Sequence, residues 1–479
     1  MIHALSVASE AYPLVKTGGL ADVVGALPDA LAPHGVVTTT LLPGYPKVLA
    51  HVDDGAVVHR WPSLLGVEAR LLAGRLGDHP LLVLDAPALF AREGGPYTDA
   101  SGRDWDDNWR RFAALSKAGA EVAAGMVGER RFDLLHAHDW QAGLAPAYLR
   151  FGGYADATKS VATIHNIAFQ GSFDAGIFPA LDLPPHAWGI EGVEYYSAVG
   201  LLKAGLWAAD AITTVSPTYA QEIRRPKFGM GLEGLIASRG ASVTGILNGI
   251  DPAVWNPASD PLLVERYNAD NLDARTANTR AVEQRFSLEA GDGPIFTVIS
   301  RLTWQKGMDV LAGLLDDLVA MGGRLAMLGS GDAGLEQAFR DAAARHPGRI
   351  GAQIGYDEPL SHLLQGGADA ILIPSRFEPC GLTQLYGLAY GCVPVVARTG
   401  GLADTVIDAN LAALDAGVAT GVQFDGVTPG SVRGAIARTV ALHADRPAWQ
   451  RMQQRGMAAD FSWTNSGARY AALYRELLA

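Results

Sequence analysis

Short apolar runs alternate with helix-periodic segments along most of the chain. In the first half, buried strands are indicated at 2–8, 36–42, 81–85, 133–138, 160–165 and 211–216, mostly separated by helical stretches such as 109–124. A second series of apolar runs lies at 294–300, 324–328, 349–354, 369–373 and 393–397. Such runs are typical of parallel strands that helices cover on both faces. The pattern therefore predicts two doubly wound α/β domains.

The stretch 238–244, Ser-Arg-Gly-Ala-Ser-Val-Thr, is the best hinge candidate between the two series. We place an N-terminal domain at 1–243, a C-terminal domain at 244–457 and a last helix within 458–479. That helix carries Trp463, Tyr470, Tyr474 and Leu477 on one face, and we expect it to dock back on the N-terminal domain. Ligands of such folds gather at the carboxyl ends of strands. We therefore expect the active site in the cleft between the domains.

Composition and charge narrow the class of partner. The net charge of −12 argues against nucleic acid or an anionic membrane, because either needs a basic surface. The chain enters a strand at once, without the pattern of a signal peptide, and no apolar run reaches the length of a membrane span. Two cysteines, Cys380 and Cys392, suit a reducing cytosol. We expect a cytoplasmic protein, and the sequence does not indicate its oligomeric state.

The hexapeptide Thr-Gly-Gly-Leu-Ala-Asp occurs twice, at 17–22 and 399–404, each time directly after a basic residue, Lys16 or Arg398. Each copy lies between an apolar run and a helix-periodic segment, 20–31 or 402–411. The pattern predicts a tight strand-to-helix turn at each Gly-Gly, whose backbone N–H groups and helix dipole can bind an anion. Two such sites suggest two lobes that hold one phosphorylated ligand. The alternative is that the glycines only turn the chain.

The segment 376–384, Arg-Phe-Glu-Pro-Cys-Gly-Leu-Thr-Gln, follows the predicted strand 369–373 and precedes the helical run 385–390. It holds Glu378 on a loop stiffened by Pro379, beside a helix N-terminus. A carboxylate for a polar or cationic ligand group and amides for phosphate oxygens would then share one short loop. A solvated glutamate in a turn is the alternative.

Six motifs in the same order resemble those of bacterial glycogen synthases and plant starch synthases. These are retaining glycosyltransferases of the GT-B fold that take glucose from ADP-glucose. The motifs lie at 16–22, 136–140, 165–171, 247–251, 300–307 and 376–384, so the resemblance covers the whole chain. Sucrose synthases usually carry a second glutamate eight positions after the first, where this chain has Tyr386. That difference favours the glycogen and starch branch.

The resemblance implies a hexosyltransferase that moves glucose from ADP-glucose to the non-reducing 4-hydroxyl of an α-1,4-glucan such as glycogen, with retention. The residues alone leave UDP-glucose or another acceptor open. We expect no metal or other cofactor, because cations of the chain can meet the diphosphate charge. Two unit charges about 4 Å apart interact by about 4 kcal/mol at an effective dielectric near 20. In the family, departing phosphate helps to deprotonate the acceptor hydroxyl on the same face.

Roles follow residue by residue from the resemblance. The catalytic group would comprise His165, Arg301, Lys306 and Glu378. The donor would be bound by Lys16, Gly18, Gly19, Asn248, Gly329, Tyr356, Cys380, Gly381, Leu382 and Thr383. The acceptor would be bound by Asp22, Tyr97, Asp139 and Asn166. Each of these could instead have a structural role: Arg301 and Lys306 as solvated residues at a strand end, and His165 as a core histidine.

Two other patterns indicate different chemistry. The stretch 329–334, Gly-Ser-Gly-Asp-Ala-Gly, matches a dinucleotide fingerprint, with Asp357 near the expected acidic position. It supports the rival function, an NAD-dependent oxidoreductase, although it follows the second strand of its domain rather than the first. His136, His138 and Asp139 could hold a metal, because residues i and i+2 of a strand point the same way. Further ligands are not evident.

Overall fold

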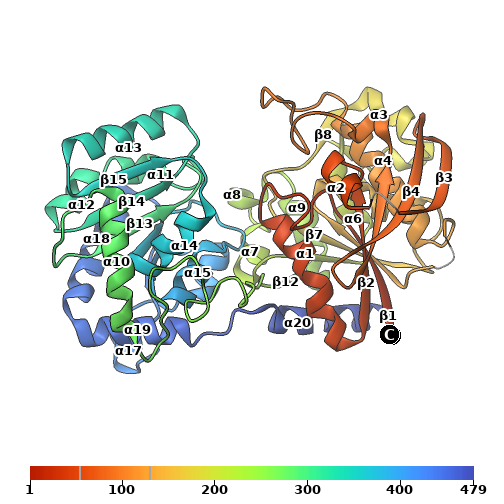
Figure 1. Ribbon diagram of the computed structural model, residues 1–479. Helices are drawn as coiled ribbons and strands as arrows, with labels where there is room; N and C mark the ends of the chain where they lie inside the picture. The colour runs from red at the N-terminus through yellow and green to blue at the C-terminus, as the bar shows by residue number, and fades with distance from the viewer. Residues whose placement is uncertain (53–54, 129–130) are drawn as a thin grey trace. The chain divides into compact units, whose positions relative to one another are not determined.

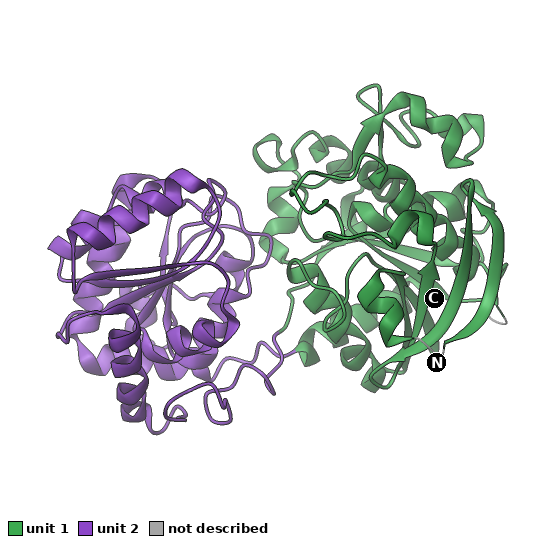
Figure 2. Cartoon of the chain, turned by 45° about the horizontal axis from the view of Figure 1, so that its top comes forward, with its two compact units in different colours: residues 1–249, 463–479 green, residues 250–462 purple. Residues whose placement is uncertain are grey.

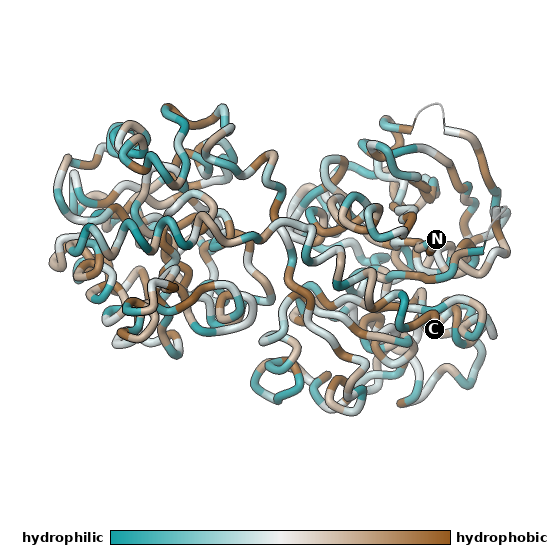
Figure 3. Tube along the Cα trace, turned by 90° about the horizontal axis from the view of Figure 1, so that it is seen from below, coloured by the Kyte–Doolittle hydropathy of each residue, from teal (hydrophilic) through white to brown (hydrophobic). Residues whose placement is uncertain are grey.

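The two strand series form separate sheets in two units of the chain. The computed structural model describes residues 1–52, 55–128 and 131–479. Unit 1 comprises 1–249 with 463–479, and unit 2 comprises 250–462 (Figure 1, Figure 2). Hydrophobic and hydrophilic stretches alternate along the trace of each unit (Figure 3). The prediction of two doubly wound α/β domains is confirmed.

Unit 1 contains one large sheet and one small one. Its strands are β1 (Ile2–Val7), β2 (Val36–Pro43), β3 (Ala56–Leu64), β4 (Val67–Leu76), β5 (His79–Asp85), β6 (Leu134–His138), β7 (Lys159–Ile164), β8 (Ser172–Asp174), β9 (Glu194–Tyr195), β10 (Ala198–Gly200), β11 (Ala211–Thr214) and β12 (Val243–Gly245). The large sheet has the order β12-β11-β7-β6-β1-β2-β5-β4-β3, and the small sheet has the order β8-β10-β9. The large sheet is parallel except where β4 pairs antiparallel with β3 and β5.

The helices of unit 1 cover both faces of the large sheet. They are α1 (Gly19–Leu31), α2 (Pro46–His51), α3 (Pro87–Phe90), α4 (Asn108–Ala123), α5 (Leu144–Phe151), α6 (Leu201–Ala208), α7 (Pro217–Glu222), α8 (Pro226–Gly229), α9 (Glu233–Ser238) and α20 (Trp463–Leu478). The last of these, α20, lies along α1 (Figure 1). Tyr470 and Tyr474 pack with Leu27 and Leu31 of α1 over the sheet. A Cβ on Gly467 would lie 2.2 Å from the carbonyl oxygen of Ala30, so glycine lets the two helices touch.

Unit 2 has one all-parallel sheet with the order β15-β14-β13-β16-β17-β18. Its strands are β13 (Ile295–Ile299), β14 (Arg324–Gly329), β15 (Ile350–Ile354), β16 (Ala370–Ile373), β17 (Val393–Ala397) and β18 (Val422–Phe424). Its helices are α10 (Arg275–Phe286), α11 (Met308–Ala312), α12 (Leu315–Ala320), α13 (Ala333–Arg345), α14 (Glu358–Gly367), α15 (Thr383–Tyr390), α16 (Gly400–Thr405), α17 (Leu411–Asp415), α18 (Pro429–Ala444) and α19 (Arg446–Met457). Phe296 and Val298 face the core under α11, α12, α13 and α18, whereas Ile295 faces α10 and α14. This alternation is that of a strand buried on both sides.

The structure differs from the sequence expectations at two connections. The hinge candidate 238–244 lies inside unit 1, because residues 243–245 form β12 and pair with β11. The chain passes between the units after Gly249 and again after Ser462. The helix expected over 402–411 ends at Thr405. Beyond it the backbone N–H of Ala409 donates to Gly421 at 2.8 Å, so this stretch pairs with a neighbouring segment instead of continuing the helix.

Candidate active site

The candidate residues of unit 2 gather where its strand order reverses. β13 is the first strand in chain order, and it pairs with β14 on one side and β16 on the other. Loops that leave the carboxyl ends of two such strands diverge to opposite sides and form the usual ligand crevice of this architecture. The loop 300–307 follows β13, and the loop 374–382 follows β16. These two loops carry Arg301, Lys306 and Glu378.

Lys306 and Glu378 are in direct contact. Lys306 Nζ donates to Glu378 Oε2 at 2.5 Å, and Ser375 Oγ donates to the same oxygen at 2.8 Å. The Glu378 side chain is 9% exposed and that of Lys306 18%. Among the described residues no hydrogen bond reaches the other carboxylate oxygen, Oε1. The site thus fixes one oxygen of Glu378 and leaves the other without a hydrogen bond from the described residues.

Arg301 supplies a second cation on the same loop. It is exposed, and its side chain makes no hydrogen bond or ion pair within the part of the chain that the structure describes. Lys306 has three N–H donors and uses one on Glu378. The loop therefore offers an unpaired guanidinium and two remaining ammonium donors to an anion.

The second hexapeptide supports the loop that carries Glu378. A Cβ on Gly400 would lie 1.9 Å from the carbonyl oxygen of Glu378, and a Cβ on Gly401 would lie 2.0 Å from that of Cys380. The N–H of Gly401 donates to the carbonyls of Glu378 and Pro379 at 3.1 and 3.2 Å. The expectation that this Gly-Gly offers its amides to an anion is therefore corrected for Gly401, whose N–H is already bonded to the loop.

The rest of this loop leads into α15. Gly381 has φ +72°, which favours glycine, and Cys380 is buried. Leu382 precedes α15 and Thr383 is its first residue, so α15 begins five residues after Glu378. The donor candidates Cys380, Gly381, Leu382 and Thr383 thus lie together on one turn.

The dinucleotide fingerprint has a structural explanation. A Cβ on Gly329 would lie 2.1 Å from the carbonyl oxygen of Ser300, and one on Gly331 would lie 2.3 Å from that of Leu302. The glycines thus let the turn after β14 pack on the loop after β13. Asp357 accepts a hydrogen bond from the N–H of Leu360 at 2.9 Å and caps α14. Because the motif follows β14, away from the point where the strand order reverses, this geometry argues against a dinucleotide.

Tyr356, another donor candidate, is 80% exposed. Its hydroxyl donates to Glu358 at 2.7 Å. The ring is therefore accessible on the surface of unit 2, close in sequence to Asp357.

In unit 1 the strand order reverses between β1 and β6, and candidate residues follow both strands. The first hexapeptide begins ten residues after β1 ends, so the tight turn expected there is wrong. The intervening loop is held by Glu10, which is buried and accepts hydrogen bonds from the N–H of Thr17 and from Thr17 Oγ1, the latter at 2.7 Å. The sequence analysis missed Glu10, although its place just after a strand end was a signal for it.

Lys16 and Asp22 flank the exposed glycines of the first hexapeptide. Lys16 Nζ donates to Asp22 Oδ1 at 2.8 Å and lies 5.5 Å from the centre of the Tyr12 ring. Gly18 is extended, and a Cβ there would meet nothing within 4 Å. Gly19 begins α1. A donor candidate and an acceptor candidate are thus an ion pair in this structure.

Tyr97 reaches the same loop from another part of unit 1. Its hydroxyl donates to Glu10 and lies 2.8 Å from Ser9 Oγ. Burial, and then the nearby Glu10 charge, raise the pKa of Tyr97 well above its ordinary value, so the phenol stays protonated. This acceptor candidate lies under the loop that carries the first hexapeptide.

Asp139 and His165 come from neighbouring strands, β6 and β7, and meet at their carboxyl ends. Asp139 Oδ1 accepts from the N–H of His165 at 2.7 Å and from that of Asn166 at 3.5 Å. Burial raises the pKa of Asp139 to about 7. Burial also lowers the pKa of His165 to about 3, so its imidazole is neutral at neutral pH.

The ring nitrogens near this site are largely used by protein partners. His165 Nε2 lies 3.0 Å from His138 Nδ1, and His138 Nε2 lies 3.1 Å from Ser6 Oγ. His136 bonds Thr163 Oγ1 at 2.5 Å and the Tyr474 hydroxyl at 2.7 Å. Within the described ranges, no group of three or more His, Cys, Asp or Glu side chains is placed to hold a metal. The paired nitrogens of His136 and His138 therefore explain that motif as a packed hydrogen-bond network.

Asn248 is buried near the end of unit 1, and its Oδ1 has no hydrogen-bond partner among the described residues. A buried acceptor without a partner is costly, so this oxygen is suited to a ligand donor.

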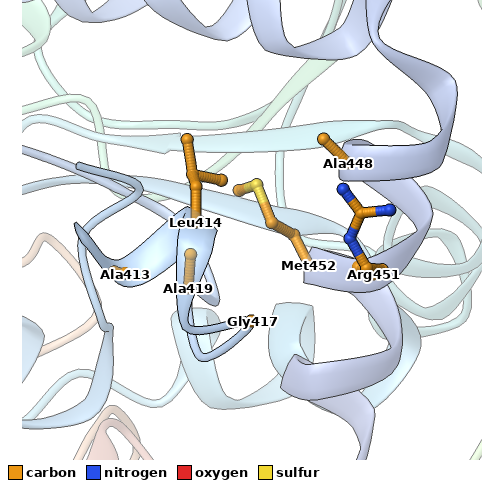
Figure 4. A pocket seen from close by; sticks show the side chains of 7 residues that line it. All are labelled: Ala413, Leu414, Gly417, Ala419, Ala448, Arg451 and Met452. Atoms are coloured by element: carbon orange, nitrogen blue, oxygen red, sulfur yellow. The ribbon is translucent and has the colours of Figure 1, made fainter. Parts of the chain in front are cut away.

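A separate hollow in unit 2 is lined by Ala413, Leu414, Gly417, Ala419, Ala448, Arg451 and Met452 (Figure 4). That hollow contains none of the candidate residues. No helix in the described part of the chain is long and apolar enough to cross a membrane.

Comparison with known proteins adds independent information. Residues 3–238 match the model of the starch synthase catalytic domain, and residues 280–445 match that of glycosyl transferases group 1. The chain is 65% identical to the glycogen synthase of Novosphingobium aromaticivorans, over 100% of this chain and 99% of that protein. It is 59% identical to glycogen synthase 1 of Rhizobium meliloti, over 100% of both chains.

Solved structures agree with these relatives. The catalytic domain of starch synthase IV from Arabidopsis thaliana, bound to ADP and acarbose, has a TM-score of 0.86 and 28% identity, over 100% of this chain and 99% of that one. A sucrose-phosphate synthase from Thermosynechococcus elongatus has a TM-score of 0.60 and 17% identity, over 100% and 99%, and shares the fold. The chain belongs to the glycogen and starch synthase family of glycosyltransferases.

Proposed function

We propose that the chain lengthens an α-1,4-glucan by transferring glucose from ADP-glucose to the non-reducing 4-hydroxyl, with retention of configuration. The observation that carries this proposal is the contact of Lys306 and Ser375 with one oxygen of Glu378, beside the unpaired Arg301. It combines a carboxylate for the sugar with cations for the diphosphate. The ADP and acarbose bound by the Arabidopsis starch synthase support the same pairing of ligands.

Arg301 and Lys306 would stabilise the departing diphosphate. Its negative charge grows as the glycosidic bond breaks, so cations aimed at it lower the barrier more than they strengthen ground-state binding. Lys306 can keep one N–H on Glu378 and use the other two on phosphate oxygens. This arrangement needs no metal, and we propose that none takes part.

Glu378 would bind the donor glucose through its remaining oxygen. Because Oε2 already accepts from an ammonium and a hydroxyl, the carboxylate is a weakened nucleophile. This favours transfer on one face, with the departing phosphate taking the proton of the acceptor hydroxyl, over a covalent intermediate. Glu378 then acts by stabilising positive charge that develops on the sugar.

The residues of unit 1 would contact the sugar and the acceptor. His165 is neutral and keeps Nδ1 without a hydrogen bond among the described residues, so it can serve the sugar without adding positive charge. Lys16 and the amides of Gly18 and Gly19 would contact the diphosphate, and Asn248 Oδ1 would accept from a ligand hydroxyl. Asp22, Tyr97, Asp139 and Asn166 would bind or shape the acceptor side.

We place this reaction in the cytoplasm, because Cys380 and Cys392 are buried thiols that form no disulfide with each other, as a reducing compartment allows. The test is a panel of ADP-, UDP- and GDP-glucose with glycogen, scored for release of nucleoside diphosphate. We expect ADP to be released from ADP-glucose only when glycogen is present. Faster release of UDP from UDP-glucose would contradict the assignment of ADP-glucose as donor. Release of ADP without glycogen would contradict transfer to a glucan.

A further inference from the structure

The loops after β13 and β16 are joined along their length. The N–H of Arg376 donates to the carbonyl of Gln305 at 2.8 Å, and Gln305 Nε2 donates to that of Phe377 at 3.4 Å. A Cβ on Gly307 would lie 2.0 Å from the carbonyl oxygen of Pro374, so glycine allows the two backbones to touch. These contacts surround the bond between Lys306 and Glu378, which belong one to each loop.

Arg376 makes the largest set of side-chain contacts across this junction. Its Nη1 and Nη2 donate to the two oxygens of Asp309 at 2.6 and 2.8 Å. Nη1 also donates to the carbonyl of Trp304, and the guanidinium lies 4.4 Å from the centre of the Trp304 ring. Hydrogen bonding to Arg376 lowers the pKa of Asp309, so the pair is ionic. A lysine cannot reproduce this fork and stacking together.

The two anchors of Arg376 bracket Lys306 in the sequence. Trp304 lies two residues before it and Asp309 three residues after it. Fixing both ends of so short a segment restricts where the Lys306 ammonium can lie. We propose that Arg376 is a positioning residue, which clamps Trp304 and Asp309 so that Lys306 is held on Glu378 and aimed at the leaving diphosphate.

The inference rests on the proposed function, because it assumes that Lys306 meets the leaving group. A displacement of about 1 Å in a catalytic group can cost on the order of 100-fold in rate. Arg376 itself need not touch substrate, and its side chain is 19% exposed. Loss of the clamp should therefore lower turnover while the donor still binds.

The experiment compares Arg376→Lys and Asp309→Asn with a matched control, Arg433→Lys. Arg433 Nε bonds Asp317 at 3.2 Å in the same unit, with both side chains largely exposed. For each variant, kcat and KM for ADP-glucose, melting temperature, and hydrogen exchange of the 303–309 segment would be measured. We expect both clamp variants to lose tenfold or more in kcat with KM changed less than threefold, and to exchange faster in this segment. The double variant should be no worse than the poorer single one.

Wild-type kcat and exchange in Arg376→Lys and Asp309→Asn would overturn the proposal. A fall in melting temperature with KM and kcat lost together would also overturn it, since that indicates a general structural role. Should Arg376→Lys fail to fold, Asp309→Asn decides, because it keeps the size of a side chain that is 40% exposed. A wild-type chain that released no ADP would contradict the proposed function instead, and the exchange data would still test the clamp.

Discussion

The same hexapeptide occurs in both units and is used in opposite ways. In the first copy Thr17, Gly18 and Gly19 are exposed, and a Cβ on Gly18 would meet nothing within 4 Å. In the second copy Gly400 and Gly401 are buried, and added Cβ atoms would lie 1.9 and 2.0 Å from carbonyl oxygens of the Glu378 loop. The exposed glycines of the first copy are accessible to a ligand, whereas the second copy is a support on which a candidate catalytic loop rests.

A buried glutamate lies beside each copy. In unit 1 the side chain of Glu10 accepts hydrogen bonds from Thr17 and holds the motif. In unit 2 the N–H of Gly401 donates to the backbone of Glu378, so the motif holds the glutamate. Identical letters therefore do not imply identical roles, because packing decides whether a Gly-Gly amide is available.

The strongest test of this contrast removes the charge that the second copy supports. Glu378→Gln keeps the size of the side chain and loses its negative charge, so we expect turnover to fall by about 10² to 10³. ADP affinity and melting temperature should stay close to wild type, because a Gln oxygen can still accept from Lys306 and Ser375 and the contacts of Gly401 involve the loop backbone. Turnover assays, calorimetric ADP titration and thermal melts on one preparation check this. Near-normal turnover would exclude the catalytic role.

Gly401→Ala should cause the next largest effect. Its Cβ would lie 2.0 Å from Cys380 O and 2.5 Å from Cys380 Cα, and backbone cannot move aside as a flexible side chain can. We expect a loss of about 3 kcal/mol in the stability of unit 2, with reduced turnover. Urea unfolding measures the stability, and a separate assay measures the turnover. Unchanged stability would show that the motif does not support the loop.

The stability of the chain is expected to depend on pH through Asp139 in unit 1. Its pKa is raised to about 7, so folding takes up a proton and stability falls as the pH rises from near 4 towards 7. Between pH 5 and 8 the free energy of unfolding of the wild type should fall by about 2 kcal/mol relative to that of Asp139→Asn. Asn can still accept both backbone hydrogen bonds, and it matches Asp139 in size and branching at this backbone position of φ 54° and ψ −166°.

The control for this comparison is Asp174→Asn, the same substitution at an exposed carboxylate that accepts from the N–H of Gly176 at 2.7 Å. Thermal melts at pH 5 and 8 should show no such divergence for it. Parallel curves for wild type and Asp139→Asn would contradict the buried, proton-binding carboxyl.

Gly18→Ala should have the smallest effect on the fold. The residue has φ −161° and ψ −168°, an extended conformation that alanine adopts, and there is room for the methyl group. We expect an unchanged melting temperature and a rise of a few-fold in KM for ADP-glucose. Steady-state kinetics with thermal melts check this, and a large loss of stability would remove the contrast with Gly401.

The strands that bear the site could be predicted from the sequence, because buried parallel strands are short continuous apolar runs. β17 has its predicted bounds, and β13 and β16 differ from theirs by a residue or so. The antiparallel hairpin of β3 and β4 was missed, since its edge position leaves mixed polar and apolar residues. The turn residues Leu65 and Gly66 both have positive φ. Hairpin turns of this kind usually have Asn, Asp or Gly at the first position, so Leu65 gives no sequence signal for the turn.

Contacts between distant loops could not be predicted from the sequence. Family motifs place Lys306 and Glu378 in the chain, but only the pairing of β13 with β16 brings them to 2.5 Å. The support of the Glu378 loop by Gly401 depends likewise on the neighbouring β17. The position of Glu10 after a strand end was visible in the sequence, but its hydrogen bonds with Thr17 and Tyr97 depend on three-dimensional contacts.

The most direct test of the account follows a labelled glucose from donor to product. The wild-type chain would be incubated with ADP-[1-¹³C]glucose and glycogen, and the polymer examined by NMR. We predict label in new α-1,4-linked residues at non-reducing ends, with one ADP released per glucose transferred. Label in free glucose, in β-linked residues, or in no product while wild type binds ADP would contradict retaining glucosyl transfer to glucan.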